Sequence, residues 1–152
     1  MELPNKISTY ISTNRQSLLD GYLRFFDKSL QSKFALLAEQ YSKWQGGIPF
    51  AITAFGDLLV WDGHYIFKYS FVDEKVDVIL SGDTFFFENL KDKDYQNEFF
   101  DLPLYYEAVK KYGSLEADES FVFEPLPYLG GSKDIEHIGK GKSFEYLSLI
   151  IG

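Results

Sequence analysis

The fold of this chain is decided by residues 50–80, which read FAITAFGDLLVWDGHYIFKYSFVDEKVDVIL. Short runs of β-branched and aromatic residues alternate here with pairs typical of tight turns, Gly56-Asp57, Asp62-Gly63 and Asp73-Glu74. Strands joined by such short connections pair antiparallel with their neighbours. The segment therefore predicts a meander of four strands, over Phe50–Phe55, Leu58–Trp61, Tyr65–Phe71 and Lys75–Leu80.

Ahead of the meander, apolar residues recur at intervals of three and four, the period of a helix. This stripe comprises Leu19, Leu23, Phe26, Leu30, Phe34, Leu37, Tyr41 and Trp44. Its expected boundaries are Thr13 or Asn14 as a cap, Gly21 and Asp27–Ser29 as places for a break, and Gly46-Gly47 before Pro49 as the end. We expect this helical layer to pack on one face of the sheet.

Helical character returns after the meander. The predicted helices are Phe85–Lys91 capped by Asp83 or Thr84, Leu102–Tyr112 ended by Gly113, and Phe144–Ile151 capped by Ser143. The stretch Phe121–Gly131 carries two prolines and a glycine pair, which predicts a mainly extended loop. The fold class is therefore α+β: N-terminal helices, a central antiparallel β-meander of about four strands, and C-terminal helices.

The composition is that of one domain with a substantial core, since 45% of the 152 residues are hydrophobic. The absence of cysteine excludes disulfides, thiolate metal sites and cysteine nucleophiles, and it fits a cytoplasmic location. The sequence shows no secretory leader and no apolar run of about 18 residues, so no membrane association is expected. The residues expected in the core are Phe26, Leu30, Leu37, Trp61, Phe67 and Phe123.

The net charge of −8 is unevenly distributed. Residues 51–124 hold sixteen acidic and six basic side chains, whereas residues 1–50 are slightly basic and residues 125–152 are neutral. Direct binding of nucleic acid needs clustered Lys and Arg, so this pattern argues against it and favours a basic partner. The alternative is that the acidic middle only keeps the protein soluble.

Binding residues concentrate on loops held by a rigid scaffold, and several acidic residues lie at or beside the predicted hairpin turns. The candidate partner-binding residues are Asp57, Asp62, Asp73, Glu74 and Asp77, with Trp61, Tyr65 and Tyr69 as aromatic anchors if their face of the sheet is uncovered. A second candidate surface comprises Glu116, Asp118, Glu119 and Glu124. The oligomeric state is not indicated.

The sequence holds no phosphate-binding glycine loop, GxSxG, HExxH or EF-hand pattern. Asp57, Asp62 and His64 invite comparison with a metal site or an acid–base pair of a small hydrolase, but Asp-Gly after a strand is an ordinary hairpin turn. We therefore predict no catalytic, cofactor-binding or metal-binding residues, and a protein that is not an enzyme.

Several short motifs follow one another along the chain in a characteristic order and spacing. They are Thr53–Trp61, Gly113, Leu115, Asp118, Glu119, Phe123, Pro125, Leu129–Gly131, Glu145, Tyr146, Leu147, Leu149 and Gly152. This arrangement resembles a GAD-related bacterial domain that forms the C-terminal part of type VI secretion immunity proteins, including ones that neutralise DNase toxins. The resemblance covers roughly the last two thirds of the chain.

We expect one immunity-type domain over residues 1–152, with residues 1–47 as a helical layer and residues 48–152 as the part that resembles the family. The resemblance implies a cytoplasmic protein without cofactors that blocks a cognate, nuclease-type toxin. The alternatives are an SMI1-like adaptor or scaffold without a toxin partner, and the small carboxylate-dependent hydrolase.

Overall fold

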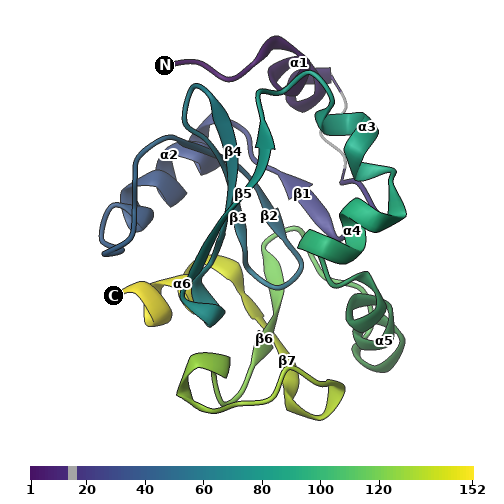
Figure 1. The fold of residues 1–152 in the computed structure, drawn as a ribbon. Helices are drawn as coiled ribbons and strands as arrows, with labels where there is room; N and C mark the ends of the chain where they lie inside the picture. Colours follow the sequence, from purple (N-terminus) through teal and green to yellow (C-terminus); the bar gives the residue numbers. More distant parts are fainter. Residues whose placement is uncertain (14–16) are drawn as a thin grey trace.

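The computed structural model describes residues 1–13 and 17–152. Its principal elements are α1 (Asn5–Thr13), β1 (Leu23–Phe25), α2 (Lys28–Ala38), β2 (Ile48–Thr53), β3 (Leu58–Trp61), β4 (Tyr65–Ser70), β5 (Lys75–Ser81), α3 (Phe86–Leu90), α4 (Lys93–Phe99), α5 (Leu102–Tyr112), β6 (Glu119–Phe123), β7 (Ile138–Lys142) and α6 (Ser143–Ile151). Strands β1 to β5 form one antiparallel sheet in sequence order, and β6 pairs with β7 in a second, two-stranded sheet. The α+β class and the central meander are thereby confirmed (Figure 1).

The N-terminal part differs from the prediction, because residues 19–26 are not helical. Leu19, Asp20 and Gly21 all have positive φ angles, a conformation that no right-handed helix can contain. The chain reverses there, and Leu23–Phe25 pairs with Ala51–Thr53 as an added strand, β1. The helical spacing of Leu19, Leu23 and Phe26 thus arises from a turn followed by a strand.

Helix α2 begins at the predicted break, Asp27–Ser29, but it ends earlier than predicted. Asp27 caps it, because its Oδ1 accepts the amide of Leu30 at 2.9 Å, and the helix ends at Ala38 rather than at Gly46-Gly47. Thr13 ends α1 instead of capping a helix start, and the other candidate cap, Asn14, lies outside the described residues.

In the C-terminal part, helix α5 has the predicted bounds and ends at Gly113. The predicted loop from Phe121 was wrong at its beginning, because Glu119–Phe123 forms β6 against β7. The other two predicted C-terminal helices correspond to α3 and α6. Within the described chain, neither has the side-chain cap that was expected. Asp83 contacts the start of α3 through its carbonyl, while Ser143 is the first residue of α6 and turns its hydroxyl to Ser120, at 2.6 Å.

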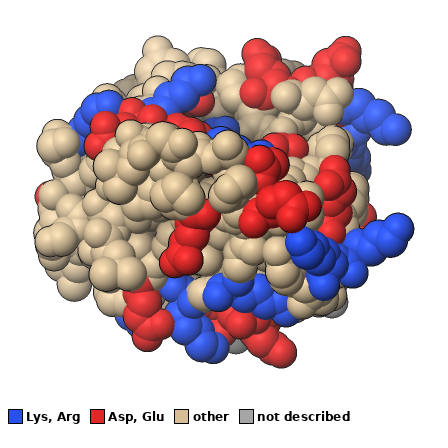
Figure 2. All heavy atoms as spheres, turned by 90° about the horizontal axis from the view of Figure 1, so that it is seen from below, with Lys and Arg blue, Asp and Glu red and all other residues tan. Residues whose placement is uncertain are grey.

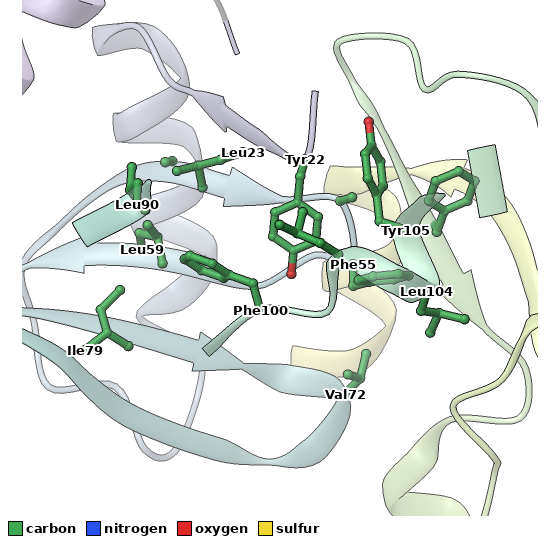
Figure 3. Close-up of a cluster of buried hydrophobic side chains, with 14 of the residues drawn as sticks. Tyr22, Leu23, Phe55, Leu59, Val72, Ile79, Leu90, Phe100, Leu104 and Tyr105 are labelled. Carbon is green, nitrogen blue, oxygen red and sulfur yellow. The ribbon is translucent and has the colours of Figure 1, made fainter. Parts of the chain in front are cut away.

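Alternation along the strands divides the core into two layers, one on each face of the sheet. Leu58 and Val60 face helices α2 and α6, whereas Leu59 and Trp61 face the side covered by α1, α3 and α5. Figure 1 shows the two sets of helices on opposite sides of the sheet, and Figure 3 shows part of the second layer around Tyr22 and Phe55. Helices therefore cover both faces, not the single face that was predicted.

Five of the six predicted core residues are buried: Phe26, Leu37, Trp61, Phe67 and Phe123. Leu30 was wrong, since 37% of its surface is exposed. It lies in the first turn of α2, where part of its side chain contacts water.

The C-terminal half is joined to the sheet by Arg24 of β1. Its guanidinium donates to the carbonyl of Glu119 at 2.7 Å and to the carbonyl of Thr53 at 3.0 Å. Burial lowers the pKa of Arg24 to about 10, so the side chain remains charged at neutral pH. A second connection is the hydrogen bond from the amide of Phe121 to the carbonyl of Ala54, at 2.7 Å.

Candidate functional site

The antiparallel topology places the acidic turns at two opposite ends of the sheet. The β2–β3 turn with Asp57 and the β4–β5 turn with Asp73 and Glu74 share one end, because two strands separate them. The β3–β4 turn with Asp62 lies at the other end. Strand β3 has four residues, so at about 3.3 Å per residue Asp57 and Asp62 are separated by roughly 15 Å. The structure brings together only part of the first candidate surface.

Asp57 is almost completely buried, with 7% of its surface exposed. Its Oδ2 accepts a hydrogen bond from the hydroxyl of Thr53 at 2.8 Å, and the same hydroxyl accepts the amide of Asp57 at 3.1 Å. This local network fixes the turn and holds the carboxylate in one orientation.

Asp73, Glu74 and Asp77 lie closer to the surface. Asp73 pairs with Lys133 at 2.7 Å, and Asp77 lies 3.7 Å from Lys75. The side chain of Glu74 is exposed, and its carbonyl accepts a hydrogen bond from Lys43 at 2.6 Å.

Asp62 shapes its own turn. Its Oδ1 accepts the amides of His64 and Tyr65 at 2.9 and 2.7 Å. Desolvation tends to raise the pKa of Asp62, but these two amide donors outweigh it and lower the pKa below its usual range. Such a geometry is the structural role expected of an aspartate that begins a turn.

The three aromatic candidates have different environments. Tyr69 is fully buried and Trp61 is 8% exposed, whereas Tyr65 is 43% exposed. Helix α2 and the residues after it cover the face on which Tyr69 lies, where the ring of Trp44 is 5.0 Å away. Of the three, Tyr65 alone presents a substantial ring surface to a partner.

The second candidate surface lies on β6 and next to both of its ends. Glu116 and Glu124 are exposed, Asp118 pairs with Lys142 at 3.0 Å, and the side chain of Glu119 accepts the amide of Glu116 at 2.8 Å. Figure 2 shows this end of the molecule from below, where acidic and basic side chains are interspersed rather than gathered by sign.

A small cleft opens beside Asp57, with a volume of about 160 Å³. Its lining comes from distant parts of the sequence: Tyr22, the β2–β3 turn, the end of β4, the β4–β5 turn, the α4–α5 connection, Phe123 and Lys133. Figure 3 shows the Tyr22 hydroxyl pointing into the side of the cluster where Phe100 and Val72 lie. Burial, reinforced by the charge of Asp57, raises the pKa of Tyr22, so its hydroxyl stays protonated.

Sequence analysis missed two acidic residues of this cleft, Glu98 and Asp101. Asp101 caps helix α5 by accepting the amide of Leu104 at 3.3 Å, and its own amide donates to the Tyr22 hydroxyl at 3.3 Å. Asp101 could have been found from the sequence, because an aspartate directly before the predicted helix Leu102–Tyr112 is a typical N-cap. Residues 83–112, which span helices α3 to α5, carry seven acidic and four basic side chains, so they form a moderately acidic flank beside the cleft.

Among the described residues, no three acidic or histidine side chains are grouped as metal ligands. Asp57 and the Asp62–His64 turn lie at opposite ends of β3, so the arrangement imagined for a hydrolase does not assemble. No helix of the described chain is both long and apolar enough to cross a membrane.

The fold thus defines an α+β protein whose antiparallel meander is covered by helices on both faces. Residues 82–152, slightly less than half of the chain, match the family model of the C-terminal part of the T6SS immunity protein Tdi1. This match supports a relationship with type VI secretion immunity proteins. Curated proteins give no match.

A solved structure with a similar fold is "Crystal structure of Atu4351 from Agrobacterium tumefaciens". The TM-score is 0.75 at 14% sequence identity, and the likeness covers 98% of this chain and 75% of that chain. At this identity the likeness concerns the fold alone. It extends over the N-terminal part, which the family model does not reach.

Proposed function

We propose that this chain is a cytoplasmic immunity protein that binds a cognate type VI secretion toxin and blocks its active site. The observation that carries the proposal is the match of residues 82–152 to the immunity family. Arg24 and Ala54 bind the main chain of that segment, so we treat residues 1–152 as one immunity-type domain.

We further propose that the toxin is a nuclease. A nuclease needs a basic groove to hold the phosphate backbone, and the acidic flank of α3 to α5 has the complementary sign. Complementary charge raises the association rate and selects the partner, while buried contacts supply much of the affinity. The action requires binding only, without catalysis or a cofactor, and without contact of this chain with DNA or a membrane.

The test is co-expression with the product of the adjacent open reading frame. We expect that product to stop growth when expressed alone, and this chain to restore growth and to co-purify with it. Purified product should degrade DNA or RNA, and equimolar chain should inhibit the degradation. An adaptor without a toxin partner would give neither rescue nor inhibition, and that result would refute the proposal. Rescue from a toxin without nuclease activity would refute the nuclease assignment alone.

A further inference from the structure

The cleft beside Asp57 has the size of a site for one side chain. Its volume is about 160 Å³. Sites for drug-sized ligands and cofactors are larger, at about 300–1,000 Å³. The cleft therefore has room for the end of one long side chain and not for a nucleotide or a comparable ligand.

Two polar residues in its wall, each largely buried, have a side-chain oxygen with unused hydrogen-bonding capacity. Ser70 is 4% exposed, and its hydroxyl has no hydrogen-bonding partner among the described residues. Ser70 and Lys68 are two residues apart on β4, so both side chains face the cleft side of the sheet. Asp57 uses Oδ2 to accept from Thr53, and within the described chain its Oδ1 accepts nothing. Neither atom is among the fully buried unpaired atoms of the described chain, so both are reachable from the cleft and free to accept from a donor that enters it.

The charge of the lining selects a cation. Among the described residues of the lining, the acids Asp57, Asp73, Glu98 and Asp101 are accompanied by two lysines. Lys133 is paired with Asp73, and Lys68 is directed at the carbonyl of Phe99. Because the described carboxylates are not grouped as metal ligands, an organic cation fits this lining better than a metal ion.

The remaining walls are aromatic, with rings from Tyr22, Phe55, Phe99, Phe100 and Phe123. A planar guanidinium stacks on such rings and is less strongly hydrated than an ammonium group. Lys133 shows that a cation can lie between a carboxylate and an aromatic ring here. Its Nζ is 2.7 Å from Asp73 and 5.8 Å from the centre of the Phe123 ring.

We propose that the cleft receives the guanidinium of one arginine from the partner protein, with Asp57 Oδ1 and Ser70 Oγ as its acceptors. This inference rests on the proposed function, because the arginine belongs to the toxin. It assigns the deepest contact of the interface to Asp57. The hydrogen bond from the Thr53 hydroxyl to its Oδ2 fixes the orientation of this carboxylate.

The test is a titration of the ¹⁵N-labelled chain with N-ethylguanidinium chloride at constant ionic strength, with ethylammonium chloride as the matched probe. We expect saturable amide shifts at Asp57, Ser70 and Asp101 with ethylguanidinium, and binding of ethylammonium weaker by about threefold or more. Shifts that do not saturate, or equal binding of the two probes, would overturn the proposal.

Variants locate the site. Asp57→Asn should weaken ethylguanidinium binding by about tenfold or more, because it removes the buried charge. Glu39→Gln, which changes an exposed acid outside the cleft, should leave the affinity unchanged. If Asp57→Asn does not fold, Ser70→Ala serves instead, since it breaks no hydrogen bond of the described chain and should weaken binding by about tenfold. An affinity that neither cleft variant changes would overturn the proposal.

The growth assay separates this inference from the proposed function. A folded Asp57→Asn chain that binds the toxin with unchanged affinity would overturn the arginine site and leave the immunity function standing. Saturable guanidinium binding in a chain that protects against no toxin would support the cleft and refute the immunity function.

Discussion

Lys133 Nζ lies 2.7 Å from Asp73 Oδ2, and this ion pair joins the β4–β5 turn to the loop between β6 and β7. The two side chains are 43% and 30% exposed, so the pair adds little stability, typically about 0–1 kcal/mol. Its importance lies in the charge of the cleft, because Lys133 neutralises one of the four carboxylates in the lining.

Lys133→Gln should therefore strengthen cation binding. We expect the affinity for ethylguanidinium to rise by about threefold at low salt and the gain to shrink as salt is added. The free energy of unfolding, measured by thermal denaturation, should change by no more than about 1 kcal/mol. Lys140→Gln, which removes a lysine outside the cleft, is the control, and an equal gain in that variant would contradict the prediction.

The turn acids and the β6 acids can be compared by charge reversal. The triple variant Asp73→Lys, Glu74→Lys, Asp77→Lys should slow association with the basic toxin by about tenfold or more and weaken its salt dependence. The triple variant Glu116→Lys, Asp118→Lys, Glu124→Lys should leave the association rate within about threefold. Stopped-flow kinetics on folded variants decides, and the reverse ranking would move the interface to the second candidate surface.

Arg24 should matter for stability more than its charge suggests. Arg24→Met removes the donors to the carbonyls of Glu119 and Thr53 and leaves both acceptors in a partly buried setting. We expect a loss of about 2–4 kcal/mol in the free energy of unfolding by urea. Lys28→Met, at an exposed position of α2, should cost less than about 0.5 kcal/mol. Equal losses in the two variants would show that the hydrogen bonds of Arg24 do not stabilise the contact between the sheet and the C-terminal half.

The two predicted core residues with opposite outcomes give a direct test of burial. Phe123→Ala should lower the free energy of unfolding by about 3–5 kcal/mol, because Phe123 is 1% exposed and packs on Phe55. Leu30→Ala should cost about 1 kcal/mol or less, since its side chain already contacts water. A large loss from Leu30→Ala would mean that the N-terminal layer packs differently.

Stability should fall in alkaline solution. Burial raises the pKa of Tyr146 to about 12, above the value of about 10 of an unfolded chain. The folded state therefore holds this proton more tightly, so its contribution is complete below pH 10 and is lost as the pH rises toward 12. Tyr146→Phe should flatten the loss between pH 10 and 12 in urea titrations. An unchanged slope would contradict the assignment.

The local signals of the sequence predicted the meander well. Turn pairs such as Asp62-Gly63 act over a few residues, so the pattern identifies them without knowledge of the rest of the chain. Strand β1 was missed for the opposite reason: Arg24 pairs with Ile52, and the short run between Gly21 and Asp27 carries no local mark of that pairing.

The candidate site was predicted in part. Asp57 and Asp73 do border one cleft, but Glu98 and Asp101 reach it only because α4 and α5 fold back over the sheet. The burial of Trp61 and Tyr69 depends equally on distant elements, since helices cover both faces. Alternation along a strand identifies two faces and does not tell which of them a helix will cover.

The joint made by Arg24 has a consequence for how such a protein can diversify. Its short contacts end on main-chain oxygen atoms, which every amino acid supplies. Substitutions of the Glu119 side chain therefore leave its bond to Arg24 intact, and the neighbouring surface can change its chemistry while the architecture persists. Surface residues of this protein can therefore be substituted during evolution while the contacts between its two halves are retained.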